Sequence, residues 1–220
     1  MAQLRVGLLA ADDDVRAGRA QMLDSLRDFR VVFEEADGEM ALRRLPEATV
    51  DMLLVNHRLR SIDGLTTIQR ICDQLVEVPL LIATGPYASP ELTVEAAKAG
   101  ALATVTMDVG AAELVATMRR VRDFEDQKEL PRLVEAFAQF KRSGGVMDLG
   151  QRDFGDLSQK QRQMISLYAQ GLSDAQSLQK LRIVAESQAK QLAAIFSKLK
   201  LRTRSQLVLV EAQMPKDSNE

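Results

Sequence analysis

The chain has 220 residues, with 29 Lys and Arg, 31 Asp and Glu, and 46% apolar residues. This length allows one large domain or two small ones, and the apolar share excludes wholesale disorder. One Cys and one His exclude a disulfide framework and a Cys/His zinc site, and argue against a Ser-His-Asp or Cys-His enzyme. No run approaches the roughly 18–20 apolar residues of a membrane helix, so we expect no membrane partner.

Charge divides the chain into two unequal parts. Residues 1–150 carry 18 basic and 24 acidic side chains, whereas residues 157–214 carry nine basic and three acidic ones. An acidic part joined to a basic part indicates two domains with different partners. The basic part is a candidate for binding nucleic acid.

Strand and helix signals alternate in the first half. Apolar runs predict strands at 4–10, 30–35, 51–56, 79–84 and 102–106, with helices between them at 15–26, 38–45, 64–75 and 89–100. Ser89 and Pro90 form a typical helix start, and Asp12 to Asp14 favour a helix N-terminus. Repeated strand–helix units predict an α/β fold with a five-stranded, doubly wound parallel sheet. Its working crevice would lie at the carboxyl ends of the strands.

The second half is predicted to be entirely helical. Helices are expected at 111–128, 131–142, 158–170, 174–181, 185–200 and 203–213, and the short connections at 171–173 and 182–184 suit a helix-turn-helix. A break at Pro131 would let the two halves fold together, whereas an unbroken helix would hold them apart. We therefore expect a first domain at 1–125, a helical linker at 126–156, a small all-α helix-turn-helix domain at 157–214 and a tail at 215–220.

Seven sequence blocks carry a resemblance to a known family. Four lie in the first half (LRVGLLAADDDVRAG, DMLLVNHRLRSIDGL, VPLLIAT and AGALATVTMD) and three in the second (LSQKQRQMISLYAQGLSD, LQKLRI and IFSKLKLRTRSQ). In this order they resemble a bacterial response regulator of the NarL/FixJ type, with a flavodoxin-like receiver domain and a LuxR-type helix-turn-helix domain. The resemblance implies a cytoplasmic transcription regulator that is not an enzyme, binds double-stranded DNA and works as a homodimer.

The receiver chemistry departs from the family pattern. In that family an acidic pair holds Mg²⁺, an Asp accepts a phosphoryl group, and a Thr or Ser and a Lys contact the phosphate. Aligned without gaps, the acidic pair falls on Ala10 and Ala11, and the phosphoacceptor position falls on Asn56. The Thr is kept as Thr84, the Lys position is Met107, and the family's aromatic switch position is Thr104. Methyl groups bind no metal and an amide is not a phosphoryl acceptor. The resemblance thus implies a degenerate receiver with no phosphorylation input and no cofactor, whose crevice is free for a protein partner or small ligand.

Three alternatives concern single positions. The acidic pair could instead be Asp12 and Asp13, displaced by two residues, although Asn56 would still lack a carboxylate. His57 is interpreted as a solvated loop residue, with a pH sensor as the alternative. Cys72 is interpreted as a core residue, with a redox sensor as the alternative.

The second domain keeps its apolar positions but not all of its DNA-contacting ones. The resemblance places the recognition helix at 185–200, where the usual Thr-Val-Lys-x-His stretch reads SQAKQ, and Gln188 replaces a residue that normally packs inward. The predicted DNA contacts are Ser187, Gln188, Lys190, Gln191, Lys198, Lys200, Arg202 and Arg204. Two functions remain open: a phosphorylation-independent DNA-binding regulator, or a protein-interaction adaptor or antagonist that has lost specific DNA binding.

Overall fold

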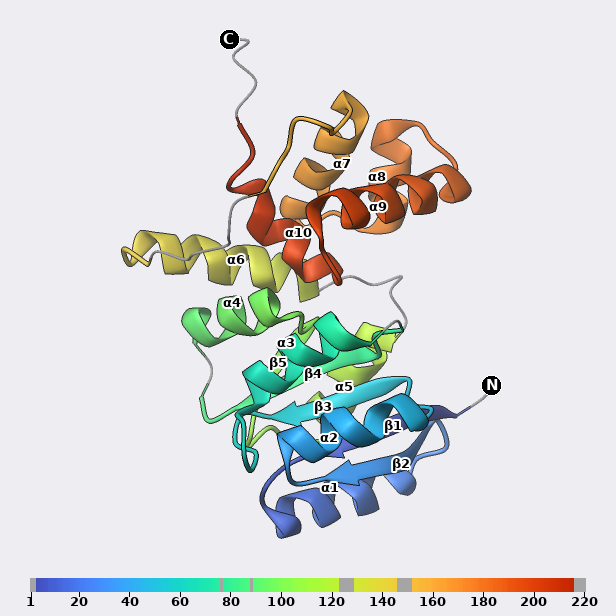
Figure 1. Cartoon of the computed structure of the whole chain (residues 1–220), viewed down its shortest axis with the longest axis vertical. Coiled ribbons are helices and arrows are strands. Elements are labelled where there is room, and N and C mark those ends of the chain that lie inside the picture. The colour runs from blue at the N-terminus through green and yellow to red at the C-terminus, as the bar shows by residue number, and fades with distance from the viewer. Residues whose placement is uncertain (1–2, 76, 88, 123–128, 146–151, 216–220) are drawn as a thin grey trace.

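The computed structural model describes residues 3–75, 77–87, 89–122, 129–145 and 152–215. Its first half is a five-stranded parallel sheet in the order β2-β1-β3-β4-β5, which confirms the predicted doubly wound fold (Figure 1). The strands are β1 (Leu4–Leu9), β2 (Phe29–Glu35), β3 (Met52–Asn56), β4 (Leu80–Gly85) and β5 (Ala103–Thr106). The helices beside them are α1 (Asp13–Asp24), α2 (Gly38–Arg44), α3 (Gly64–Gln74), α4 (Pro90–Ala99) and α5 (Ala111–Arg122), and a 3-10 turn at Leu45–Glu47 follows α2.

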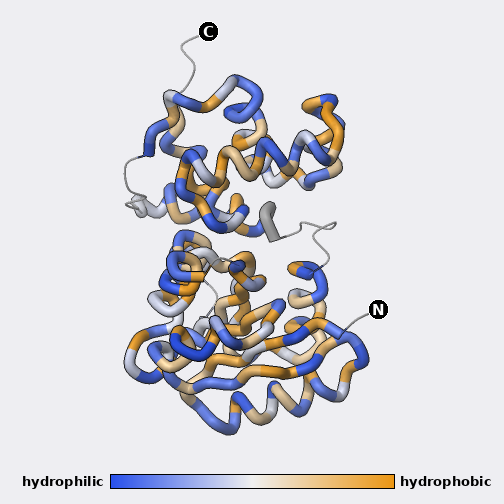
Figure 2. Tube along the Cα trace, turned by 45° about the vertical axis from the view of Figure 1, so that its right-hand side comes forward, coloured by the Kyte–Doolittle hydropathy of each residue, from blue (hydrophilic) through white to orange (hydrophobic). Residues whose placement is uncertain are grey.

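Each face of the sheet is covered by its own hydrophobic cluster. Leu23 of α1 and Met118 of α5 belong to one cluster, whereas α2, α3 and α4 contribute to the other. Strand β3 is buried along its whole length, because Leu54 joins the first cluster and Leu53 joins the second. Successive side chains of a strand point to opposite faces, which accounts for the uninterrupted apolar run in its sequence. The strands accordingly carry much of the hydrophobic colour in Figure 2.

Local signals set the starts of the helices. The Asp12 side chain accepts hydrogen bonds from the backbone amides of Asp14 and Val15, and the Ser89 hydroxyl accepts one from the amide of Leu92. Each bond satisfies an amide that has no partner within the helix. Both predicted caps are confirmed.

The second half is helical, as predicted. Its helices are α6 (Glu129–Arg142), α7 (Gln159–Ala169), α8 (Asp174–Leu181), α9 (Ala185–Leu199) and α10 (Arg204–Glu211). The sequence pattern extends α5 to residue 128, but 123–128 lie outside the described residues, as do 216–220 of the predicted tail. Helix α6 begins two residues before Pro131, and a proline is tolerated in the first turn of a helix.

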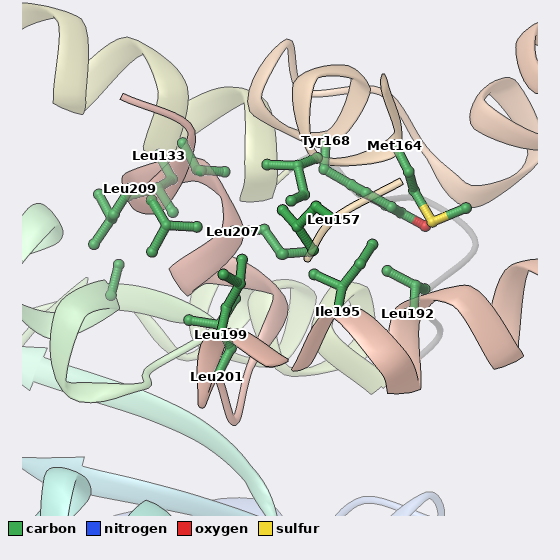
Figure 3. Packing of buried hydrophobic residues seen from close by; sticks show 14 of the residues in the cluster. Leu133, Leu157, Met164, Tyr168, Leu192, Ile195, Leu199, Leu201, Leu207 and Leu209 are labelled. Carbon is green, nitrogen blue, oxygen red and sulfur yellow. The ribbon is translucent and has the colours of Figure 1, made fainter. Parts of the chain in front are cut away.

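The two halves share a continuous hydrophobic cluster. The cluster of the C-terminal helices includes Val94 and Ala97 of α4 and Leu133 of α6. Figure 3 shows Leu133 beside Leu207 and Leu209 of α10. Helix α10 packs against α7, α4 and α6, so α4 has one face on the sheet and another on the C-terminal helices (Figure 1). The halves therefore pack together, but the predicted break at Pro131 is not found, because Pro131 lies in the first turn of α6. No helix in the described parts of the chain is long and apolar enough to span a bilayer.

Candidate functional site

The carboxyl ends of three neighbouring strands bring the predicted crevice residues together. Ala10 follows β1, Asn56 ends β3, and Thr84 lies in β4 as the register partner of Asn56. All three are almost fully buried. Met107 follows β5 and is joined to β4 by a 2.8 Å hydrogen bond from its amide to the carbonyl oxygen of Gly85. The sheet thus gathers these residues at the edge where the strand pattern predicts a crevice.

Asn56 is buried at this edge of the sheet. It is 2% exposed, and its side-chain Oδ1 accepts a 3.2 Å hydrogen bond from the backbone amide of Arg58. Its Nδ2 donates no hydrogen bond within the described residues. An amide at this point offers a hydrogen-bond donor, whereas a carboxylate offers only acceptors.

Thr104 lies apart from Asn56 and Thr84. The Thr104 hydroxyl is 3.1 Å from the Thr93 hydroxyl of α4, and both line a cavity of about 260 Å³ between β5, α4, α5 and α6. Ala11 is half-buried, and its amide bonds the carbonyl oxygen of Arg58. Thr104 therefore belongs to a neighbouring cavity rather than to the Asn56 crevice.

The side chains at the crevice do not fit a divalent cation. Hard cations bind carboxylate and carbonyl oxygens, and the positions beside Asn56 carry the methyl groups of Ala10 and Ala11. The alternative pair is already engaged, because Asp12 caps α1 and Asp13 bonds Arg16 at 2.7 Å. Within the described ranges no three His, Cys, Asp or Glu side chains form a metal-binding group. The crevice therefore supports no step through Mg²⁺.

Two arginines of α1 reach this edge of the sheet, and the sequence analysis did not identify them. Arg16 donates to the carbonyl oxygen of Ala10 at 2.6 Å and pairs with Asp13. Arg19 lies 3.5 Å from both the Thr84 hydroxyl and the carbonyl oxygen of Met107. Burial lowers the pKa of Arg19. The available signal was their spacing, because residues three apart share one face of a helix.

His57 and Cys72 lie in more enclosed surroundings than a surface loop offers. His57 is half-buried, and its Nδ1 is a buried atom without a hydrogen-bond partner in the described structure, so the solvated interpretation is corrected. Cys72 is 2% exposed in the α2–α4 cluster, and burial raises the pKa of its thiol to about 12. The prediction of a core cysteine is confirmed.

The structure corrects the expectation for Gln188. It is 4% exposed, and its Nε2 donates to the Tyr168 hydroxyl at 3.0 Å and to the Asp174 carbonyl at 3.3 Å. This side chain faces the core because it stands at a position that packs inward, so it is not available to a base edge here. Gln191 is also engaged, since its Oε1 accepts a 3.0 Å hydrogen bond from Gln161.

A polar network joins four helices around Tyr168. Tyr168 of α7 donates to the carboxylate of Asp174 at the start of α8, and Arg204 of α10 donates to both oxygens of that carboxylate at 2.6 Å. The Arg204 guanidinium also lies 5.7 Å from the centre of the Tyr168 ring. Gln188 of α9 completes the network. Burial and the bond to Asp174 raise the pKa of Tyr168. Arg204 therefore serves the fold in this arrangement.

The other predicted DNA contacts differ in their availability. Ser187 is half-buried, and Lys200 is exposed. Lys190 is exposed and pairs with Glu186 at 2.7 Å, and Lys198 bonds the carbonyl oxygen of Asp156 at 2.5 Å. Arg202 donates to two carbonyl oxygens of the first half. All four cations are exposed, and among them only Lys190 and Lys200 make no side-chain bond to another described element.

Comparison with known proteins gives likenesses over nearly the whole chain. The Bacillus subtilis transcriptional regulatory protein LiaR is 23% identical over 203 residues, covering 92% of this chain and 94% of the relative. The Mycobacterium tuberculosis transcriptional activator DevR/DosR is 23% identical over 211 residues, covering 96% and 95%. A Salmonella enterica serovar Typhimurium RcsB structure bound to promoter rprA shares the fold, with a TM-score of 0.53, 16% identity and coverage of 97% of this chain and 100% of that one.

A family match covers the α/β half. Residues 8–119 match the response regulator receiver domain, which is half of the chain and spans β1 to α5. The match includes Asn56, Thr84 and Met107 of the crevice. The chain therefore belongs to the response regulator receiver family.

Proposed function

We propose that this protein is a DNA-binding transcription regulator that acts as a dimer and needs no phosphorylation of its receiver domain. The regulator role is supported by relatives that are themselves named as transcription regulators and match both halves of the chain. The helix-turn-helix assignment is supported by α8 and α9, which are joined by the short connection 182–184. LiaR and DevR/DosR are named for transcriptional regulation, which supports the expectation that the chain is not an enzyme.

The observation that carries phosphorylation independence is the amide of Asn56 at the end of β3. Phosphoryl transfer to a protein carboxyl requires a carboxylate nucleophile and a cation that neutralises the transferred group. Asn56 supplies no such nucleophile, and Ala10 beside it supplies no metal ligand. The crevice therefore lacks both requirements.

The test is incubation of the full chain with a small acyl-phosphate donor and Mg²⁺. We expect no added phosphoryl group by intact-mass measurement and the same DNA affinity with and without the donor. The variant Asn56→Asp is the matched comparison, because it restores only the carboxylate. A stable acyl-phosphate adduct on the wild-type protein, or DNA binding that depends on the donor, would contradict the proposal.

The packing of the two halves buries α10, the helix through which a dimer is expected to form. Leu207, Val208, Leu209 and Val210 of α10 are all buried, and α7, α4 and α6 contact this helix. In the resembled family this fourth helix pairs two protomers. A dimer formed through α10 therefore requires α10 to separate from α4 and α6, and we infer that opening accompanies DNA binding.

The second candidate is a protein-interaction adaptor that has lost specific DNA binding. It is favoured by the side-chain amides of Gln188 and Gln191, because Gln188 is buried and both make hydrogen bonds within the domain. An adaptor would bind a protein partner but no specific DNA site. The two candidates therefore differ in whether a defined DNA sequence can be recovered.

A further inference from the structure

We propose that the cavity between β5, α4, α5 and α6 binds a small neutral molecule that has one apolar ring and one O–H or N–H donor. This site goes beyond the proposed function, because it assigns a ligand to the first half of the chain whether or not the other half binds DNA. Three features of the cavity point to such a ligand: its volume, its apolar walls and the hydroxyl pair of Thr93 and Thr104.

The cavity has room for one ring and a substituent. Its volume is about 260 Å³, whereas a cavity of about 150 Å³ is large enough to bind benzene. The space arises because α4 and the chain at β5 carry small side chains here, namely Ala97, Ala101 and Ala103. A gap of this size between packed elements deprives their side chains of contacts, which a ligand would supply.

The walls of the cavity are mostly apolar. Leu92 of α4, Val105 of β5 and Leu133 of α6 line it, and α4 and α6 pack side by side (Figure 1). Two exposed side chains of opposite charge, Glu113 and Arg132, also belong to the lining, so the cavity does not select an ion of either sign. Walls of this kind favour a neutral molecule with little polar surface.

Two threonine hydroxyls supply the polar contact for the ligand. Thr93 donates a hydrogen bond to the carbonyl oxygen of Ser89 at 3.0 Å. A hydroxyl has a single proton, so in the 3.1 Å contact between the two hydroxyls Thr104 donates and Thr93 accepts. No described residue donates to the Thr104 oxygen, which therefore keeps its acceptor capacity for a ligand. The partner of this oxygen must be an O–H or N–H group.

This arrangement distinguishes the proposed ligand from two other classes. A molecule that only accepts hydrogen bonds, such as an ether or a carboxylate, would place its lone pairs against those of Thr104. A hydrocarbon would fill the volume but leave the Thr104 oxygen without a donor. A ring with one donor satisfies both the walls and the hydroxyl pair, and phenol is the simplest example.

The test is a titration of the ¹⁵N-labelled full chain, followed by NMR, with phenol in one arm and toluene in the other. The two probes have nearly the same size, but only phenol carries a donor. We expect saturable shifts at the amides of Thr93 and Thr104 with phenol. Toluene measures the part of the binding that depends on volume and apolar contact alone.

The double variant Thr93→Val/Thr104→Val removes both hydroxyls and nearly keeps the side-chain volume. Both threonines are replaced, because the Thr93 oxygen would otherwise accept from phenol in place of Thr104. A buried donor that loses its partner is costly, so the half-saturating phenol concentration should rise at least about tenfold, while that of toluene should not rise. Thr49→Val is the control, because Thr49 is an exposed threonine outside the cavity, and both probes should bind this variant as they bind the wild type.

A second variant, Thr104→Phe, places a ring in the cavity and should abolish the binding of both probes. If either variant does not fold by circular dichroism, the other one decides the result. Phenol shifts that never saturate, that lie away from the cavity, or that have the same half-saturating concentration in every folded variant would overturn the site. Each of these outcomes would leave the DNA-binding proposal unaffected.

Discussion

Arg202 donates a hydrogen bond from Nε to the carbonyl oxygen of Cys72 at 2.5 Å, and a second guanidinium nitrogen bonds the carbonyl oxygen of Leu75. These carbonyls lie at the C-terminal end of α3, where the last carbonyls lack partners within the helix and the helix dipole is negative. Gln206 adds a bond to the carbonyl oxygen of Lys98 at 3.0 Å. A residue that the sequence assigns to DNA phosphates thus joins the two halves of the chain.

Replacing Arg202 with Ala should loosen this junction. Hydrogen bonds that involve a charged group contribute about 1.5–3 kcal/mol each when well formed, and the exposed part of this side chain reduces that contribution. We expect the amides of α10 to exchange with solvent about tenfold faster in Arg202→Ala, measured by native-state hydrogen exchange. Lys200→Ala is the matched control, because Lys200 is an exposed cation two residues away. Equal exchange in both variants would show that Arg202 does not hold the halves together.

Gly100 should be far less tolerant of substitution than Gly18. Gly100 has φ +122°, and a Cβ there would stand 2.4 Å from the Sγ of Cys72, whereas a Cβ at Gly18 meets nothing within 4 Å. Gly100→Ala should cost about 1–3 kcal/mol in the free energy of unfolding. Gly18→Ala should raise the free energy of unfolding by about 0.5–1 kcal/mol, because alanine has a higher helix propensity than glycine. Urea denaturation measures both, and similar effects at the two sites would contradict the packing described around Gly100.

Substitution of Gln188 should lower the stability of the fold, whereas substitution of Lys190 should weaken DNA binding. Gln188→Ala removes two hydrogen bonds in the buried network of Tyr168 and Asp174, so we expect a loss of about 1–3 kcal/mol in the free energy of unfolding. Lys190 is exposed, so Lys190→Ala should change stability by less than about 0.5 kcal/mol while weakening sequence-specific DNA binding. Thermal denaturation and DNA titration give the two readouts. A stable Gln188→Ala protein with weakened DNA binding would return Gln188 to the DNA-contacting set.

The buried Cys72 thiol should make the free energy of unfolding fall at alkaline pH, and it should react slowly with thiol reagents in the folded protein. Burial raises the pKa of its thiol from 9.0 to about 12, so between these values the unfolded chain is ionised and the folded chain is not. The contribution of the protonated Cys72 thiol to the free energy of unfolding is therefore fully present below pH 9 and is lost as pH rises toward 12. Cys72→Ala should show a smaller fall in the free energy of unfolding over this range. At pH 8 a disulfide reagent should label the native protein much more slowly than the protein in urea, and fast native labelling would contradict the burial of Cys72.

The sequence predicts the parts of this fold that depend on neighbouring residues. The run Asp51–Asn56 indicates a buried strand, and Ser89 and Asp12 indicate helix starts, because these signals lie within a few residues of the structure they specify. The crevice positions of Ala10 and Asn56 follow from strand order, since parallel strands end at one edge of the sheet.

Contacts between distant segments are less predictable. Arg19 meets Thr84 across 65 positions of the chain, and Arg202 meets Cys72 across 130. No local pattern gives either arginine a partner within the chain, and only the packing of α1 against the sheet and of the C-terminal helices against the first half brings these partners close. Gln188 was partly predictable. Its position in the helix indicated a side chain that packs inward, but its polar amide led to its prediction as a DNA contact.

The most direct test of the central claim is selection of bound duplexes from a random DNA library, with the full-length protein, no phosphodonor and two salt concentrations. A dimeric regulator that needs no phosphorylation should recover a two-fold symmetric motif with half-sites about one helical turn apart. The motif should persist at the higher salt, because contacts to bases are less sensitive to counterions than contacts to phosphates. Recovery of only salt-sensitive DNA without a shared sequence, or of no DNA, would contradict the account and favour an adaptor that binds protein.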